Sequence, residues 1–150
     1  MSTQQPVAEI VDNLVHEDTQ VTDLSVDLTV SAIYEVDEPG RLDFGGDELE
    51  DATFEPVPTE PRHPDDDYEW WELSGGQYVF QYNEFIATEP EVPLFVQPRN
   101  ELLARGGSHP SVTVYSHLPL MSLSVADGGI NIKENARLSV LIPISIGAES

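Results

Sequence analysis

The clearest structural signal in this sequence is the stretch LSVDLTVSAIYEV, residues 24–36. Apolar and polar side chains alternate along it and several are β-branched, which is typical of one or two β-strands with a buried face. Shorter stretches of the same kind follow, separated by turns that contain glycine or proline. These predicted strands are 78–82, 92–96, 111–115, 120–125, 130–133 and 136–146. Many short strands with frequent turns predict an all-β sandwich or barrel.

Two short segments predict helix. In PVAEIVDNLV, residues 6–15, apolar side chains recur at helical spacing, so a short amphipathic N-terminal helix is expected. In NELLAR, residues 100–105, one or two helical turns are expected, closed by Gly106 and Gly107.

Length and composition predict a single domain over residues 1–150, long enough for a hydrophobic core. Residues 37–67 combine many acids with five prolines and three glycines, so they are expected to form an acidic surface excursion. Cysteine is absent, which excludes disulfides and thiolate metal sites. No apolar run approaches the roughly 18 residues of a membrane span, and the start lacks the features of a signal peptide. A cytoplasmic protein without membrane contact is expected.

The charge of the chain is unevenly distributed. The formal net charge is −22, and the first 91 residues carry 24 of the 28 acids but two of the six bases. Such a surface repels phosphates, so free nucleic acid is not expected as a partner. The acid excess with a single lysine favours a halophile's protein over an acidic protein from an ordinary cell, since molar salt screens self-repulsion. The neutral, arginine-bearing remainder is expected to face a partner subunit, an anionic ligand or both.

Three segments, in this order, resemble a known family. They are LSVDLTV at 24–30, GQYVF at 76–80 leading into PRNELLARG at 98–106, and DGGI at 127–130 followed by ARLSVL at 136–141. Together they resemble the dCTP deaminase and dUTPase superfamily, and the SVDL strand after a helix resembles its deaminase branch. The resemblance implies a distorted β-sandwich or jelly roll of the dUTPase-like (β-clip) type that assembles as a homotrimer.

The resemblance also implies a site. In the superfamily the site lies between subunits and takes a deoxynucleoside triphosphate, dCTP or dUTP, with Mg²⁺ on the phosphates. By this resemblance Arg99 and Arg105 hold phosphates. Asp27 orients a neighbouring arginine or the sugar, and Glu101 supports the pocket. The structural alternative is that these arginines form ion pairs with nearby carboxylates.

The sequence departs from the family pattern at the site. Asn100 and Glu101 stand where the family has two serines, and a glutamate there would repel a phosphate. Residues 107–110 alone separate the helix from the next strand, so the hairpin that holds the pyrimidine is expected to be missing. In that strand, 112–116, Tyr115 stands near the position of the family's water-activating glutamate. No catalytic residue is therefore assigned.

Other polar residues have a functional and a structural interpretation. His109 could act as a general base or be a solvated turn histidine, and His117 is expected in a loop. Glu101 or Glu134 could activate water, or could cap a helix or pair with a neighbouring base. The four histidines lack metal-ligand spacing, so no protein metal site is predicted.

The acidic and aromatic residues after residue 64 also have two interpretations. Asp65-Asp66-Asp67 could bind a cation, but it lacks the spacing of a calcium loop, and a solvated surface is the alternative. Trp70 and Trp71 could stack on a base, or could anchor the excursion onto the core.

Three functions follow from these observations. The favoured one is pyrimidine deoxynucleoside triphosphate metabolism, as a dCTP deaminase or a dUTP nucleotidohydrolase. The second is a catalytically silent trimeric homologue that binds nucleotide or regulates. The third is an acidic interaction protein whose 37–67 excursion binds a basic partner.

Overall fold

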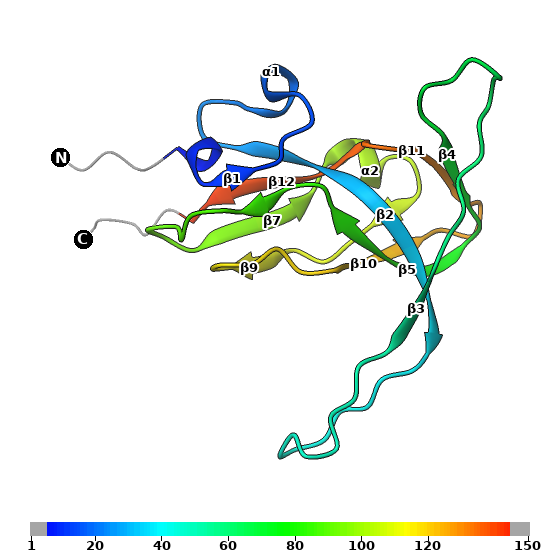
Figure 1. Cartoon of the computed structure of the whole chain (residues 1–150), viewed down its shortest axis with the longest axis horizontal. Coiled ribbons are helices and arrows are strands. Elements are labelled where there is room, and N and C mark those ends of the chain that lie inside the picture. Colours follow the sequence, from blue (N-terminus) through cyan, green and yellow to red (C-terminus); the bar gives the residue numbers. More distant parts are fainter. Residues whose placement is uncertain (1–5, 145–150) are drawn as a thin grey trace.

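The computed structural model describes residues 6–144 and consists mainly of short antiparallel strands (Figure 1). The strands are β1 (Val11–Asp12), β2 (Val26–Glu38), β3 (Thr53–Pro56), β4 (Trp70–Leu73), β5 (Gly76–Tyr82), β6 (Phe85–Ile86), β7 (Leu94–Pro98), β8 (Gly107–Ser108), β9 (Val112–Val114), β10 (Met121–Val125), β11 (Ile130–Lys133) and β12 (Arg137–Pro143). Short helical segments accompany them, namely η1 (Val7–Glu9), α1 (Glu17–Gln20) and α2 (Asn100–Leu103). The predicted all-β fold is confirmed, and its curled antiparallel sheet is consistent with the distorted β-sandwich that the resemblance implies.

Strand β2 organises the main sheet because its partner changes along its length. Its first part pairs with β12, where Asp27 lies opposite Val140, its middle pairs with β5, and its last part pairs with β3. The full order is β8-β10-β5-β2-β12-β7-β9, with β3 beside β2. Two smaller ladders, β1–β6 and β4–β11, complete the sheets. Most of the stretch 24–36 therefore lies at the centre of the fold, in the single strand β2, which continues to Glu38.

Alternate residues of the strands fill the core. Along β5, Tyr78, Phe80 and Tyr82 are buried and the residues between them are more exposed, and β7 and β10 alternate in the same way. Burying each such apolar side chain contributes about 1.5–3 kcal/mol, so the alternation decides which face of a strand turns inward. The largest fully buried side chains include Phe80, Leu28, Ile33, Leu94, Met121, Leu123 and Leu141.

A long β-hairpin leaves the body of the molecule, and we call its residues 35–55 the arm (Figure 1). The end of β2 pairs with β3 near the body, and Arg41 pairs with Glu50 closer to the tip. Much of the predicted 37–67 excursion is therefore ordered hairpin, because main-chain pairing continues beyond the edge of the body.

A short N-terminal helix is present, but not with the predicted bounds of 6–15. That segment forms the single turn η1 and then β1, in which Val11 lies opposite Ile86 of β6. Val7 and Ile10 are buried, so the apolar spacing reflects real packing, while strand pairing overrides the helical periodicity. The α-helix α1 follows later and was not predicted. None of the helices within residues 6–144 has the length and apolar character needed to span a membrane.

Candidate functional site

Two arginines converge on Asp27, which lies on β2 beside β12. Nη1 of Arg137, at the start of β12, is 3.0 Å from Oδ2 of Asp27. Nε of Arg99, which directly follows β7, is 3.5 Å from the same oxygen. The Asp27 side chain is 14% exposed, so the carboxylate is well shielded from water. Two guanidinium groups therefore share one largely buried carboxylate.

The remaining predicted site residues lie around α2. Nη2 of Arg99 is 3.4 Å from Oε1 of Glu101, and Nη1 of Arg105 donates a hydrogen bond to the carbonyl oxygen of Glu101 at 3.0 Å. Arg105 is exposed, and it makes no ion pair within the described part of the chain. These contacts link Asp27, Arg99 and Glu101, and Arg105 lies one helical turn beyond Glu101. Arg99 is held by carboxylates, whereas Arg105 is open to solvent.

Arg137 belongs to the same group, although the sequence argument gave it no role in the site. Its side chain is 37% exposed, and its Nη1 also donates to the carbonyl oxygen of Thr19 at 3.4 Å. The signal that could have identified it is its place in the segment 136–141, which is one of the three that carry the resemblance.

Two hollows flank these arginines. The first, of about 330 Å³, lies over Asp27 and Arg99 and has mainly polar walls. The second, of about 220 Å³, lies between α2 and β11–β12 and has mainly apolar walls, and we call it the apolar hollow. Its lining includes the apolar residues Leu102, Ile130, Ile132 and Leu138 and the bases Arg105, Lys133 and Arg137.

Five of the six bases of the chain lie in this region, and we call them the basic cluster. The members are Arg62, Arg99, Arg105, Lys133 and Arg137. Cζ of Arg62 is 4.7 Å from the ring centre of Trp70, and Nζ of Lys133 is 5.6 Å from that of the same ring. The sixth base, Arg41, is in the arm. On a chain with a net charge of −22, the basic cluster gathers most of the positive charge, and the carboxylates of Asp27 and Glu101 lie beside it.

His109 is buried, so its interpretation as a solvated turn histidine is wrong. Its Nδ1 lies 2.9 Å from the carbonyl oxygen of Pro110, which can only accept, so Nδ1 carries the proton. Its Nε2 therefore accepts from Oγ of Ser139 at 2.7 Å, and that oxygen lies 2.6 Å from the hydroxyl of Tyr82. Burial lowers the pKa of His109 and raises the pKa of the Tyr82 phenol. Because Ser139 is fully buried, this chain of hydrogen bonds joins the core and faces neither hollow beside Asp27.

Glu134 and the tryptophans fasten the end of the excursion to the body. Oε1 of Glu134 accepts a hydrogen bond from the backbone N–H of Glu69 at 2.7 Å. Trp71 is 3% exposed, and its Nε1 donates to the carbonyl oxygen of Val57 at 3.1 Å. The anchoring role is therefore confirmed for Trp71. Trp70 is half-buried and lines the apolar hollow.

The acidic run after residue 64 forms an exposed loop. Asp65 and Asp67 are exposed, and Oδ2 of Asp66 accepts hydrogen bonds from the backbone N–H groups of His63 and Arg62. These hydrogen bonds lower the pKa of Asp66, and the bond from His63 has the larger effect. Within residues 6–144, no group of three or more histidine, aspartate or glutamate side chains is arranged to hold a metal ion.

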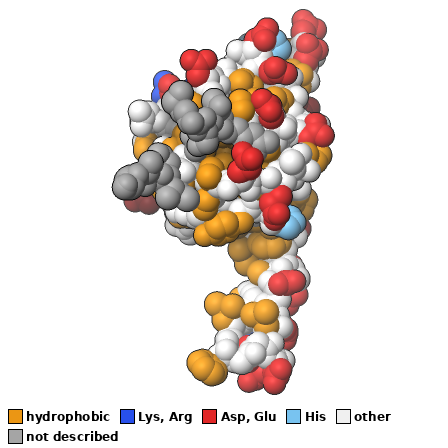
Figure 2. Space-filling view, turned by 90° about the vertical axis from the view of Figure 1, so that its left-hand side faces the viewer, with side chains coloured by type: hydrophobic (Ala, Val, Ile, Leu, Met, Phe, Trp, Pro, Cys, Tyr) orange, Lys and Arg blue, Asp and Glu red, His pale blue; other side chains and the backbone are white. Residues whose placement is uncertain are grey.

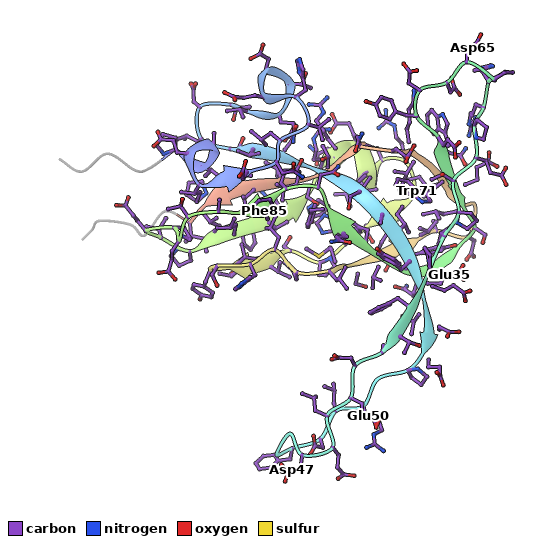
Figure 3. All side chains as sticks on the ribbon, viewed as in Figure 1. Glu35, Asp47, Glu50, Asp65, Trp71 and Phe85 are labelled. Carbon is purple, nitrogen blue, oxygen red and sulfur yellow. The ribbon has the colours of Figure 1, made fainter. Side chains whose placement is uncertain are left out.

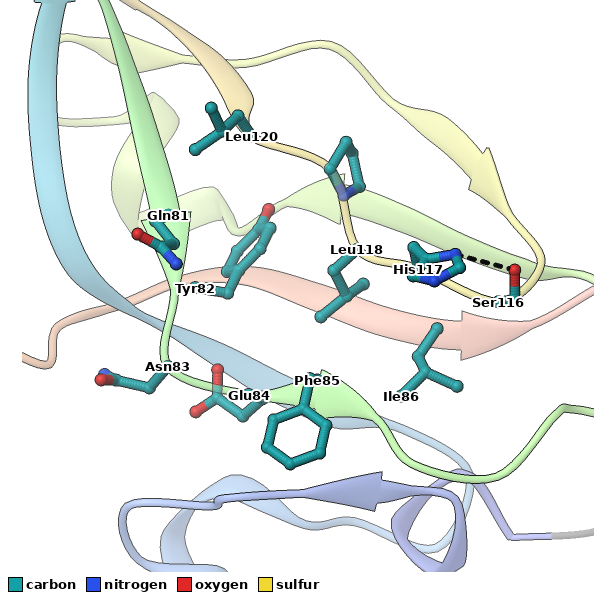
Figure 4. Close-up of a pocket in the computed structure, with 11 residues that line it drawn as sticks. Gln81, Tyr82, Asn83, Glu84, Phe85, Ile86, Ser116, His117, Leu118 and Leu120 are labelled. Atoms are coloured by element: carbon teal, nitrogen blue, oxygen red, sulfur yellow. Dashed lines mark hydrogen bonds between the residues drawn. The ribbon is translucent and has the colours of Figure 1, made fainter. Parts of the chain in front are cut away.

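A third hollow, of about 370 Å³, lies between the end of β5 and the loop 115–120 (Figure 4). His117 is in this loop, as predicted, and its Nδ1 lies 2.9 Å from Oγ of Ser116. Glu84 lines the hollow but is 3% exposed, and its carboxylate accepts hydrogen bonds from Thr29 and Gln20. No lysine or arginine occurs in the described lining, so this hollow is less suited to phosphates than the two beside Asp27.

Comparison with known proteins supports a dUTPase-like relationship. The chain is 34% identical over 87 residues to each of two Halobacterium salinarum proteins, from strains R1 and NRC-1, named "Probable deoxyuridine 5'-triphosphate nucleotidohydrolase". That match covers 57% of this chain and 50% of each relative, so the chain spans about half the length of these relatives. A Methanosarcina acetivorans protein with the same name is 24% identical over 159 aligned residues, covering 97% of this chain and 84% of the relative. No family model matches the chain.

Proposed function

We propose that this chain acts in pyrimidine deoxynucleoside triphosphate metabolism, with dUTP as the first candidate substrate. The observation that carries the proposal is the basic cluster beside two hollows on a chain of net charge −22. Guanidinium groups present paired donors that match phosphate oxygens. The names of the similar proteins support dUTP, and the SVDL strand supports the deaminase branch and hence dCTP.

The arginines divide into two roles in this proposal. Arg105 and Arg137 are accessible enough to contact phosphates. Arg99 is 18% exposed and lies between Asp27 and Glu101. Its guanidinium group is therefore not free to bind a phosphate, and in this proposal it orders the site and contributes positive charge. The site would be completed between subunits of a homotrimer, as the resemblance implies, which brings further groups to the hollows.

Hydrolysis of dUTP would break the bond between the α-phosphorus and the oxygen that bridges to the β-phosphorus. A water oxygen forms the new bond, dUMP and pyrophosphate leave, and the proton of the water passes to solvent or a nearby base. Because the described residues offer no cluster of metal ligands, Mg²⁺ would arrive on the nucleotide phosphates. When bound there, it spreads the negative charge of the phosphates.

One observation favours the second candidate, a catalytically silent nucleotide-binding homologue. The carboxylates beside the polar hollow are Asp27 and Glu101, and both lie against arginine nitrogens. Both carboxylates already face guanidinium groups, so the described lining of the polar hollow offers no unengaged carboxylate to direct a water toward a phosphate. A silent protein would keep nucleotide affinity without turnover.

The test is turnover of dUTP and dCTP with Mg²⁺ by the purified chain, in low and in molar salt. Release of dUMP and pyrophosphate supports the hydrolase, release of ammonia from dCTP supports the deaminase, and binding of a non-hydrolysable triphosphate without turnover supports the silent homologue. Folded protein that neither binds nor turns over nucleotide overturns the proposal. Arg105→Ala should weaken nucleotide binding at least tenfold, and Arg41→Ala, in the arm, is the matched control.

A further inference from the structure

The arm exposes several large apolar side chains to solvent, and the most exposed of them lie at its tip. Phe44 is fully exposed, Leu42 is 91% exposed and Leu49 is 57% exposed, and Val36 and Phe54 are exposed nearer the body. Figure 2 shows hydrophobic and acidic side chains next to one another at the end of the arm. A soluble surface rarely presents a set of large apolar side chains on one projecting element unless a partner covers it.

The arm also lacks support from the body. It is a two-stranded hairpin, and Figure 3 places Asp47 at its far end and Trp71 in the body, well apart. An isolated two-stranded hairpin is marginally stable in water, because it cannot bury enough apolar surface. Docking the tip on another surface would supply that burial.

The charge of the arm limits which surface can receive it. Nine of its residues are acids, namely Glu35, Asp37, Glu38, Asp43, Asp47, Glu48, Glu50, Asp51 and Glu55. Its single base, Arg41, is already 3.1 Å from Glu50. The receiving surface must therefore be apolar at its centre and basic at its edge.

The body of this same chain has such a surface. The apolar hollow is lined by Leu102, Ile132 and other apolar side chains, and its charged lining consists of three bases, Arg105, Lys133 and Arg137, and one acid, Glu101. The basic cluster around it contains five of the chain's six bases. By contrast, the polar hollow over Asp27 has a single base, Arg99, and the two hollows beside the loop 115–120 have no lysine or arginine in their described lining.

We propose that the arm of one copy of this chain docks into the apolar hollow of a second copy, with Phe44 entering the hollow and the arm acids facing the basic cluster. A contact of this kind joins two different surfaces, so it forms a ring or a reciprocal pair where the geometry closes and an open filament where it does not. It brings carboxylates of a neighbouring copy next to Arg105 and Arg137, so a docked arm and a nucleotide would compete for these two arginines. The proposal does not depend on nucleotide chemistry, and its test uses no nucleotide.

The absence of cysteine allows a site-specific test. Phe44→Cys and Asn131→Cys are made as two separate proteins, since Asn131 is exposed and lines the apolar hollow. The two are mixed and oxidised in low and in molar salt. A disulfide requires Cα atoms within about 7 Å, so the mixed dimer should form efficiently if the arm docks. Leu24→Cys, at an exposed position outside the hollow, replaces Asn131→Cys as the control.

A mixed dimer that forms at least tenfold faster than the control pair supports the proposal. Equal rates for the two pairs overturn it, because random collision then accounts for both. The mixed design excludes a link within one chain, since neither protein carries both cysteines.

The mass of the assembly gives a second readout. The double variant Leu42→Ser with Phe44→Ser should dissociate the native oligomer, while Leu24→Ser should not, and circular dichroism should report folded protein for both. Association of the native chain should strengthen with salt, because two copies of net charge −22 repel each other at long range. A monomeric native chain in molar salt, or an oligomer that survives the double substitution, overturns the proposal.

Discussion

Nη1 of Arg137 lies 3.0 Å from Oδ2 of Asp27, and this contact joins β12 to β2 across 110 residues of sequence. Arg99 approaches the same carboxylate from the end of β7. Three strands that are adjacent in the sheet are therefore tied together by one largely buried carboxylate. Arg99 lines the polar hollow and Arg137 lines the apolar hollow, so the shared carboxylate positions one arginine beside each hollow.

Replacing Asp27 by asparagine should destabilise the protein. The substitution leaves Arg99 and Arg137 without their shared counter-charge, and losing charge-assisted bonds of this kind costs about 1–3 kcal/mol. Chemical unfolding should show a lower midpoint with an unchanged slope. Asp23→Asn, at an exposed position just before β2, is the matched control. An Asp27→Asn midpoint equal to that of the control would show that the ion pairs contribute nothing to folding.

The sequence predicted most of the strands because their patterns are local. Alternation fixed the positions of β5, β10 and β11, and the stretch 24–36 contains most of β2. The very short strands β1, β6 and β8 have two residues each, too few for any alternation. They exist because distant segments pair with them, and no local pattern encodes that pairing.

The site could be predicted only in part for a similar reason. The resemblance placed Asp27, Arg99, Glu101 and Arg105 in one site, and the structure links the first three while Arg105 lines the neighbouring apolar hollow. It did not show that Arg99 would be held by two carboxylates, nor that Arg137 would share Asp27, since both depend on the register between strands. For His109 the sequence left a general base and a solvated turn histidine as alternatives, because the loop around it shows no burial pattern, whereas its neighbours in space are Phe80 and Ser139.

The buried hydrogen bonds of Ser139 predict that Ser139→Ala destabilises the protein more than Tyr82→Phe. Ser139→Ala leaves both the Tyr82 hydroxyl and Nε2 of His109 without a partner, and each unpaired buried group costs about 1–3 kcal/mol. Tyr82→Phe removes one donor and leaves Ser139 bonded to His109. Ser139→Ala should therefore lower the free energy of unfolding more than Tyr82→Phe. Urea unfolding of both variants at pH 8 measures the difference, and the reverse order would contradict the proton positions assigned to this chain.

The pKa of His109 predicts a loss of stability in acid. Burial lowers this pKa in the folded protein, so below about pH 6.5 the unfolded chain binds a proton that the folded chain does not. The free energy of unfolding should then fall as the pH decreases from about 6.5 toward the lowered folded value. His109→Gln should be less stable at pH 8 but should lose this part of the pH dependence. His117→Gln, in the exposed loop, is the control, and an identical pH profile for native protein and His109→Gln would exclude the buried neutral histidine.

The carboxylate of Glu84 predicts a coupling between the N-terminal segment and β2. Oε1 accepts from the backbone N–H of Thr29 at 2.8 Å, and Oε2 accepts from Oγ1 of Thr29 and from Nε2 of Gln20. The same Nε2 donates to the carbonyl oxygen of Asp27, so α1 is tied to β2 at the candidate site. Glu84→Gln replaces one acceptor oxygen by an NH₂ group that faces donors, which should cost about 1–3 kcal/mol.

Where the Glu84→Gln variant loses stability shows whether Glu84 links α1 to β2 or supports the whole fold. In Glu84→Gln, hydrogen exchange should accelerate first at residues 17–20, because Gln20 loses its carboxylate partner, while β5 and β10 remain protected until global unfolding. Glu89→Gln, at an exposed position, should leave exchange unchanged throughout. If exchange in the Glu84 variant rises equally in α1 and in the core strands, the carboxylate supports the whole fold, and α1 is not a separately fastened element beside Asp27.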